Sequence, residues 1–285
     1  MAKIIVTHSS PDFDGISPDF DGIPAIWLLK KFHPDFKNAR VEFVPAGTTY
    51  NNEPVDSNPD IVHVDTGMGR FDHHQSDDFT CGAQLVYEWL LKEGYIKDDE
   101  ALERMIKVIT ELDHAYDAYR WPEPSSDRWE FNLHSVLTGW KMMYGREDDK
   151  YIDLTIQGLE AVYLLMKQKV KAEEEVEKGE KFKTRWGEGV AIYTANDSVL
   201  DAAIKGGYAV VVRKDPGKGY IRVTGSNAHD VDLTKAYEDL KKADGEATWF
   251  LHASKKLLRN GSTRNPTMKP TKLELAEVIK ILEKG

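Results

Sequence analysis

The sequence predicts an α/β protein built from two domains and a long connecting helix. Short β-branched apolar runs alternate with helical patterns in the first part of the chain, which is the order of a parallel sheet with crossover helices. A proline-free stretch with a helical apolar stripe begins near Tyr151. Three more apolar runs follow it. We therefore predict a first domain at residues 1–150, a linker helix at 151–182 and a smaller C-terminal α/β domain at 183–285.

The N-terminal elements follow from apolar runs and their boundaries. Pro24 suits the first turn of a helix, because proline lacks the N–H that this turn leaves unpaired. Runs bounded by Pro, Gly and Asn predict buried parallel strands, and apolar residues at helical spacing predict helices. The predicted order is strand Lys3–Thr7, helix from Pro24, strand Arg40–Val44, strand Ile61–Val64, helix Gly82–Leu91 and helix Ala101–Leu112.

The C-terminal half begins with the predicted linker helix, whose apolar stripe gives way to Lys and Glu before Phe182. GVAIYTA, YAVVVRK and GYIRVTG then read as strands separated by short helical or turn stretches. Pro216-Gly217 predicts a hairpin turn between the last two. These strands and helices make the smaller α/β domain.

Composition limits the function. The 285 residues carry a net charge of −10, which disfavours a coat for long duplex nucleic acid. The segment from His252 to Lys272 has six Lys or Arg and no acid, which suits a small phosphate-bearing ligand. Cys81, the one cysteine, excludes an internal disulfide and a multi-cysteine zinc site. The first apolar run is too short for a signal sequence or a membrane span, so we expect a cytoplasmic protein without a membrane partner. A monomer and a homodimer both fit the sequence.

Metal-binding residue types follow several predicted strands and helices. His8 and an Asp-x-Asp pair follow the first strand, Asp65 follows the strand IVHV, Asp72-His73-His74 comes shortly after, and Asp113 ends a helix. Because parallel sheets bind ligands beyond the carboxyl ends of their strands, we expect these side chains to converge. Carboxylates and imidazoles gathered together require cations to offset their repulsion and lost hydration. This donor set favours Mn²⁺, with Mg²⁺ or Co²⁺ as alternatives.

This motif series resembles the DHH phosphoesterase superfamily. The resemblance rests on the pattern His8-x-x-x-Asp-x-Asp-Gly, the later Asp65, the phrase FDHHQ and Asp113. The short interval between Asp65 and FDHHQ, together with the late phrase FLHAS, looks most like the melanocyte proliferating gene branch, whose members are described as 3'–5' exonucleases acting on RNA. The resemblance implies an N-terminal parallel-sheet DHH domain that catalyses phosphoester hydrolysis.

The resemblance also implies roles for individual residues. One divalent cation would be held by His8, Asp12 and Asp65, and a second by Asp14, Asp65, His73 and Asp113. His74 would face the substrate, so that the predicted catalytic residues are His74, Asp65 and Asp14. The second domain would bind the substrate through His252, Ser254, Arg259 and Arg264. LLRNGSTRN stands where relatives usually carry a glycine-rich stretch, which is a departure at the substrate end.

One phrase, SPDFDGI, occurs twice in succession, at residues 10–16 and 17–23. Asp12 and Asp14 keep the interval from His8, whereas the alternative pair Asp19 and Asp21 keeps the connection to the helix at Pro24. We favour the first pair, because His8 and its partners must meet one cation. A duplication that displaces the ligands would leave a folded and inactive protein.

The sequence therefore predicts a two-metal phosphodiesterase acting on short RNA oligonucleotides or small nucleotide phosphodiesters. The alternatives are a pyrophosphate or polyphosphate hydrolase, and a catalytically silent protein that binds metal and nucleotide. Asp117 is a reserve ligand one turn beyond Asp113, and His114 either orients Asp113 or is a plain helix residue. Cys81 is interpreted as a packing residue, as are the isolated histidines at positions 33, 63, 134 and 229.

Overall fold

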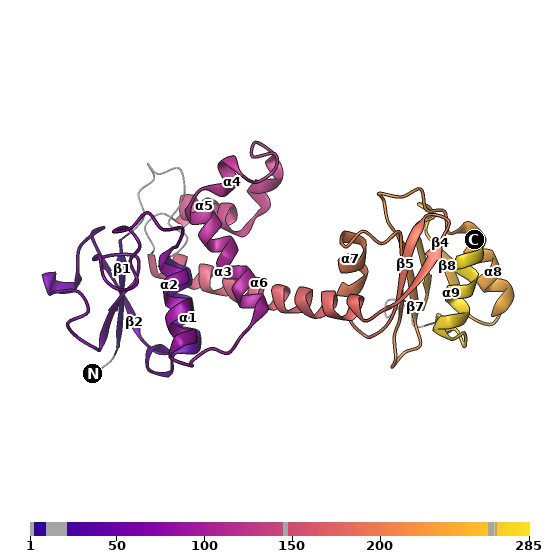
Figure 1. The fold of residues 1–285 in the computed structure, drawn as a ribbon, viewed down its shortest axis with the longest axis horizontal. Helices are drawn as coiled ribbons and strands as arrows, with labels where there is room; N and C mark the ends of the chain where they lie inside the picture. Colours follow the sequence, from indigo (N-terminus) through magenta and orange to yellow (C-terminus); the bar gives the residue numbers. More distant parts are fainter. Residues whose placement is uncertain (1–2, 10–21, 145–147, 262–264, 266) are drawn as a thin grey trace. The chain divides into compact units, whose positions relative to one another are not determined.

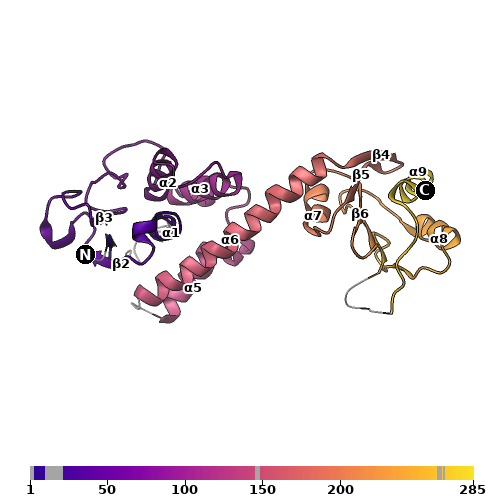
Figure 2. The same cartoon turned by 90° about the horizontal axis from the view of Figure 1, so that it is seen from below.

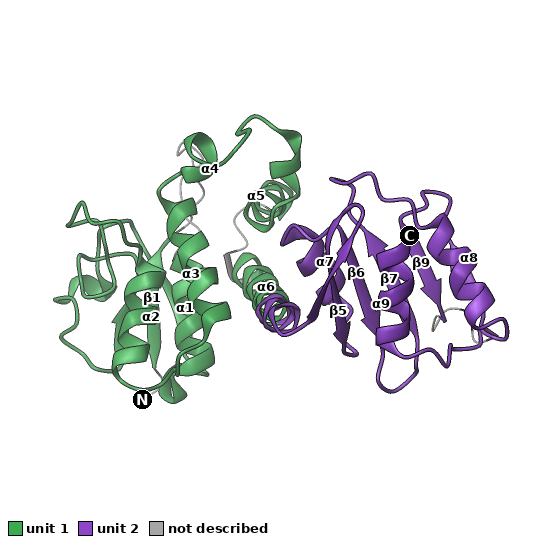
Figure 3. Ribbon diagram, turned by 45° about the vertical axis from the view of Figure 1, so that its right-hand side comes forward, with its two compact units in different colours: residues 1–167 green, residues 168–285 purple. Residues whose placement is uncertain are grey.

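The computed structural model describes residues 3–9, 22–144, 148–261, 265 and 267–285. The chain divides into two compact units, unit 1 (residues 1–167) and unit 2 (residues 168–285). The division falls within one long helix, α6 (Asp148–Glu177), which coincides with much of the predicted linker (Figure 3). None of the helices in the described part of the chain is both long and apolar enough to cross a membrane.

Unit 1 is built around a three-stranded parallel sheet, as the sequence predicts. Its strand order is β2-β1-β3, and β1 pairs with both neighbours in parallel. The helices α1 and α2 lie side by side on one face of this sheet (Figures 1 and 2). The strands are β1 (Ile4–His8), β2 (Arg40–Val44) and β3 (Ile61–His63). The helices before α6 are α1 (Gly22–Phe32), α2 (Gly82–Lys92), α3 (Glu100–Asp113), α4 (Tyr116–Tyr119) and α5 (Leu133–Tyr144), with short 3-10 turns at Pro34–Phe36, Tyr50–Asn52 and Asp127–Phe131.

The core of unit 1 lies between the sheet and its helices. Ile5 and Val6 of the central strand are fully buried, and so are Trp27 and its neighbours along α1. Apolar burial of this kind supplies most of the driving force for folding. The strand β2 differs from the prediction of a buried strand, because it is an edge strand and only Val44 is buried.

The start of the helix α3 is specified by local chemistry. Asp99 caps its start, since the Asp99 side chain accepts a hydrogen bond from the Leu102 N–H at 3.1 Å. Apolar residues at helical spacing, such as Met105 and Ile109, face the core. The helix ends at Asp113, so a predicted metal ligand occupies its last position.

Unit 2 is a six-stranded mixed sheet of order β4-β5-β6-β7-β9-β8. Only the β5–β6 pair is parallel among these described strands. One face packs against α7 and the last turns of α6, and the other against α8 and α9 (Figure 2). The strands are β4 (Glu180–Thr184), β5 (Gly187–Tyr193), β6 (Val210–Lys214), β7 (Ile221–Gly225), β8 (Trp249–Leu251) and β9 (Leu257–Asn260), and the helices are α7 (Ser198–Lys205), α8 (Thr234–Ala243) and α9 (Leu275–Lys284).

The end of the predicted linker helix is a strand instead. α6 stops at Glu177, and Glu180–Phe182 belongs to β4, which pairs antiparallel with β5. Phe182 is buried in the core of unit 2 while its charged neighbours are exposed, which is the two-residue period of a strand. The predicted turn at Pro216-Gly217 does connect β6 to β7, and the Gly219 N–H donates to the Asp215 carbonyl there at 2.9 Å.

Candidate metal centre

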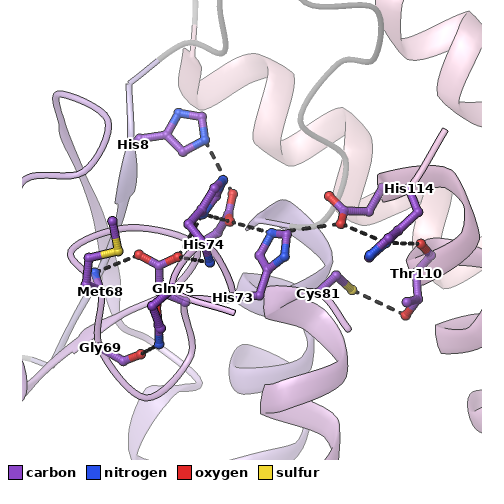
Figure 4. A network of polar contacts seen from close by, with 12 residues as sticks. His8, Met68, Gly69, His73, His74, Gln75, Cys81, Thr110 and His114 are labelled. Atoms are coloured by element: carbon purple, nitrogen blue, oxygen red, sulfur yellow. Dashed lines mark hydrogen bonds and ion pairs between the residues drawn. The ribbon is translucent and has the colours of Figure 1, made fainter. Parts of the chain in front are cut away.

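The register of the parallel sheet brings His8 and Asp65 together at its carboxyl edge. β1 and β3 pair with Val6 opposite His63. Two residues further along the chain from this pair stand His8, the last residue of β1, and Asp65, just beyond the end of β3. His8 Nε2 consequently lies 3.4 Å from Asp65 Oδ2 (Figure 4).

Asp65 begins a tight loop that returns the chain to the sheet edge. Its N–H donates to the Phe71 carbonyl at 2.9 Å, which closes the loop. Asp65 has a φ of 52°, in the left-handed region that aspartate tolerates better than most residues, and Gly67 has a φ of 81°. A Cβ at Gly67 would also come within 3.0 Å of Thr49 Cγ2. This loop places the Asp72-His73-His74 segment beside the Asp65 carboxylate.

Three imidazoles face the two oxygens of the buried Asp65 carboxylate. His73 Nε2 lies 3.5 Å and His74 Nδ1 3.6 Å from Oδ1, while His8 approaches Oδ2. The side chain of Asp65 is 2% exposed. Two ligand atoms about 2.1 Å from one cation, at angles of about 90–110°, are separated by roughly 3.0–3.4 Å. The separations of His8 and His73 from Asp65, 3.4 and 3.5 Å, lie at or just above the upper end of that range. These three residues therefore fit a divalent cation, and their oxygen and imidazole donors suit Mn²⁺ or Mg²⁺.

Asp113 extends this group of side chains from the end of α3. Its Oδ2 lies 3.8 Å from His73 Nε2 and 3.3 Å from His114 Nδ1. His114 Nδ1 also lies 3.1 Å from the Thr110 carbonyl oxygen, one helical turn back. The contacts support the interpretation of His114 as a residue that orients Asp113 (Figure 4).

Asp72 has a role that the sequence reasoning missed. Its carboxylate accepts hydrogen bonds from the Met68 N–H at 2.7 Å and the His74 N–H at 3.1 Å, and His74 Nδ1 lies 2.8 Å from Oδ1. Because a carboxylate only accepts, Nδ1 donates and Nε2 of His74 remains for another ligand. Burial favours the neutral acid, but the bonds from His74 and Met68 outweigh it and lower the pKa of Asp72. The signal available in the sequence was an Asp two residues before His74.

The electrostatics of the centre favour positive charge. The hydrogen bond with Asp65 raises the pKa of His73, against the effect of burial, and the charge of Asp113 raises it further. A proton on His73 partly neutralises these carboxylates. A divalent cation bound among the same atoms would replace that proton and neutralise them more completely.

Two residues beside the centre do not contribute to it. Asp117, the reserve ligand, pairs with His134 instead, with Oδ2 and Nε2 3.5 Å apart. Cys81 is fully buried with its Sγ 3.4 Å from Thr110 Oγ1, which agrees with a packing role. Burial raises the pKa of the Cys81 thiol to about 11.

Both Asp-x-Asp pairs lie outside the described residues. These are Asp12 and Asp14 of the first SPDFDGI phrase and Asp19 and Asp21 of the second. Of the predicted metal ligands, the structure brings together His8, Asp65, His73 and Asp113. Their function as ligands stays a prediction.

The predicted substrate residues of unit 2 occur at the β8–β9 turn and along β9. His252 and Ser254 contact each other, with Nδ1 and Oγ 2.9 Å apart, and both are exposed. Arg259 lies on β9 opposite Arg222 of β7. Arg264 lies outside the described residues. Three of the nearby lysines are used within unit 2, since Lys255 pairs with Asp232, Lys272 with Glu246, and Lys256 donates to backbone carbonyls.

Comparison with known proteins gives distant structural likeness alone. No family model matches the chain, and no curated protein sequence does. The chain is similar to the crystal structure of RecJ in complex with Mg²⁺ from Thermus thermophilus, at 10% identity and a TM-score of 0.35. The match covers 99% of this chain and 49% of RecJ, so the chain spans about half the length of that protein. A likeness of this size does not define the activity of the chain.

Proposed function

We propose that the chain is a divalent-metal-dependent phosphodiesterase that hydrolyses short RNA oligonucleotides or small nucleotide phosphodiesters. The proposal rests on the buried Asp65 carboxylate. Imidazoles from the end of β1 and from the loop after β3 face its two oxygens. His8 beside one oxygen and His73 beside the other are the residues that would hold divalent cations together with Asp65.

The ligand residues have a defined task in this proposal. His8, Asp65, His73 and Asp113 would hold the cations, together with Asp12 and Asp14 or with Asp19 and Asp21. Two such cations supply an activated water and neutralise the phosphoryl oxygens. The chain's contribution is to fix the donors on strand ends and on the last residue of α3, where the sheet and core hold them.

The pair of Asp72 and His74 serves the substrate in this proposal. Asp72 fixes the His74 ring by its 2.8 Å contact with Nδ1, and the His74 side chain is 56% exposed. The remaining nitrogen, Nε2, can hydrogen-bond a phosphoryl oxygen or move a proton at the leaving oxygen. In unit 2, His252, Ser254, Arg259 and Arg264 are proposed to bind substrate phosphate or ribose groups.

The proposal is tested by hydrolysis of a 5'-labelled RNA five-mer in Mn²⁺ and in EDTA. Wild type is compared with Asp12→Ala/Asp14→Ala and with Asp19→Ala/Asp21→Ala. The proposal is supported if the RNA is shortened only when Mn²⁺ is present and only one of the double variants loses this activity. The variant that loses it identifies the working copy of SPDFDGI. Turnover of pyrophosphate alone would favour the phosphoanhydride hydrolase, and bound metal without any turnover would favour the silent binding protein.

A further inference from the structure

An aromatic side chain stands at the rim of the candidate metal centre. Phe79 lies in the loop after His74, and its ring centroid is 4.4 Å from that of His114. His114 contacts Asp113 at 3.3 Å. A single side chain therefore separates the Phe79 ring from a predicted metal ligand.

Other aromatic residues hold the Phe79 ring in place. Tyr116 stacks on it, with centroids 5.0 Å apart and an angle of 25° between the planes. Tyr119 packs against Tyr116 at 5.5 Å, and the Arg120 guanidinium lies 4.3 Å above the Tyr116 ring centroid. Phe79 is still 47% exposed, so this ordered stack keeps apolar ring surface in contact with water. Burial would be more favourable for folding alone.

Phe79 also lines a cavity of about 300 Å³ between α2 and α3. Its wall includes Gln84, whose Oε1 accepts from Thr110 Oγ1 at 3.0 Å and whose Nε2 donates to Glu88 Oε1 at 2.9 Å. This part of a largely apolar wall is thus polar and held in position by hydrogen bonds. A planar heterocycle with donors and acceptors on its edge matches such a wall beside an aromatic ring.

The charge of this cavity disfavours a phosphate group. Glu88 and Glu103 line it, against the one lysine Lys107. An uncharged ring is not repelled by these two carboxylates. The cavity and the candidate metal centre therefore suit the two different parts of a nucleotide, the base and the phosphate.

We infer that Phe79 and the α2–α3 cavity form the base-binding subsite of the enzyme. One nucleobase of the substrate stacks on Phe79 while its phosphodiester lies at Asp65, His73 and Asp113. This inference rests on the proposed function and narrows its substrate to base-bearing esters, since inorganic pyrophosphate has nothing to place on Phe79. Aromatic stacking is tolerant of sequence, so the subsite favours nucleotides without selecting one base.

The kinetic test compares the dinucleotide ApA with analogues that lack the base of one nucleoside. Stacking on an aromatic side chain changes binding by about 5- to 150-fold per base. We expect Phe79→Ala to raise KM for ApA by such a factor and to leave KM for one abasic analogue unchanged, while Phe79→Trp retains the wild-type values. Phe131→Ala, which removes an aromatic ring that is 86% exposed elsewhere in unit 1, is the matched control. Equal effects of Phe79→Ala on all substrates would overturn the inference.

A binding test separates this inference from the proposed hydrolysis. A dinucleotide that carries 2-aminopurine loses fluorescence when that base stacks. A phosphorothioate linkage in this dinucleotide slows its turnover. We expect wild type and Phe79→Trp to quench the 2-aminopurine fluorescence, and Phe79→Ala to leave it unchanged. Quenching of this probe, together with no hydrolysis of unmodified ApA in Mn²⁺, would keep the subsite and reject the enzyme. Hydrolysis without quenching, or quenching that survives in Phe79→Ala, would reject the subsite.

Discussion

His74 Nδ1 lies 2.8 Å from Asp72 Oδ1, and Asp72 is almost fully buried while the His74 side chain is half exposed. The buried partner is fixed by two backbone N–H groups, those of Met68 and His74. This pairing sets both the tautomer and the orientation of an exposed ring at the edge of the candidate metal centre. In the proposed function, Asp72 is therefore a positioning residue, and His74 is the group that would meet the substrate.

Asp72→Asn tests this division of roles. An amide in place of the carboxylate weakens the contact with His74 and lets the ring turn, so we expect activity to fall by about 10- to 100-fold. Mn²⁺ binding, measured by calorimetry, should stay near that of wild type because Asp72 does not face the centre. Asp77→Asn, at an exposed position in the same loop, provides the control. A variant that loses Mn²⁺ as well as activity would place Asp72 among the ligands.

Divalent cations should stabilise the protein through Asp65. A ligand at 100 times its Kd adds about 2.7 kcal/mol to the free energy of unfolding. We expect saturating Mn²⁺ to raise the melting temperature of wild type relative to EDTA, and to leave that of Asp65→Asn unchanged. Equal shifts in both proteins would show that Mn²⁺ binds elsewhere.

His33 should make the protein sensitive to acid. Burial lowers the pKa of His33 below its ordinary value, and the neutral ring accepts the Asp35 N–H at 3.2 Å. A histidine whose pKa is lower in the folded state contributes stability that is present above its unfolded pKa of about 6.5 and is lost as the pH falls through its folded pKa. His33→Asn keeps an acceptor but does not titrate. Urea unfolding at several pH values below 6.5 measures the free energy of unfolding. This free energy should fall less steeply with falling pH in the variant than in wild type, by at most about 1.4 kcal/mol per pH unit. Parallel losses in the two proteins would contradict this account.

Cys81 should resist alkylation in the folded protein. With its pKa raised to about 11, the thiol is almost entirely protonated at pH 8.5, and the thiolate is the reactive form. We expect iodoacetamide to modify native Cys81 at least roughly 100-fold more slowly than the urea-unfolded chain, from the thiolate fraction alone. Mass spectrometry of timed samples measures both rates. Comparable rates would mean that the pocket around Cys81 opens readily.

The sequence predicted the sheet and the convergence of residues at its edge for a physical reason. Strands such as Ile4–His8 are short apolar runs with clear boundaries, and in a parallel sheet the residues after each strand must meet at one edge. His8 and Asp65 follow directly from that rule, once β1 and β3 are adjacent. The adjacency itself is a tertiary property that no local pattern contains.

Other features depended on contacts that are distant in the sequence. The sequence of the short strand β4 resembles the charged end of a helix. Phe182 is stabilised in a strand by its burial in the core of unit 2, which the local sequence does not show. Asp72 looked like part of a loop until its three hydrogen bonds were visible. Phe79 carries no motif, and its position beside His114 depends on where α3 ends. The roles of side chains were thus harder to predict than the elements that hold them.

The most direct test of the central claim is the rate of RNA five-mer hydrolysis by wild type and Asp65→Asn, each with saturating Mn²⁺ and with EDTA. The account predicts hydrolysis by wild type in Mn²⁺ alone, and a loss of at least about 100-fold in Asp65→Asn, while Asp77→Asn retains the wild-type rate. Hydrolysis that persists in EDTA, or that survives the loss of the Asp65 carboxylate, would contradict it.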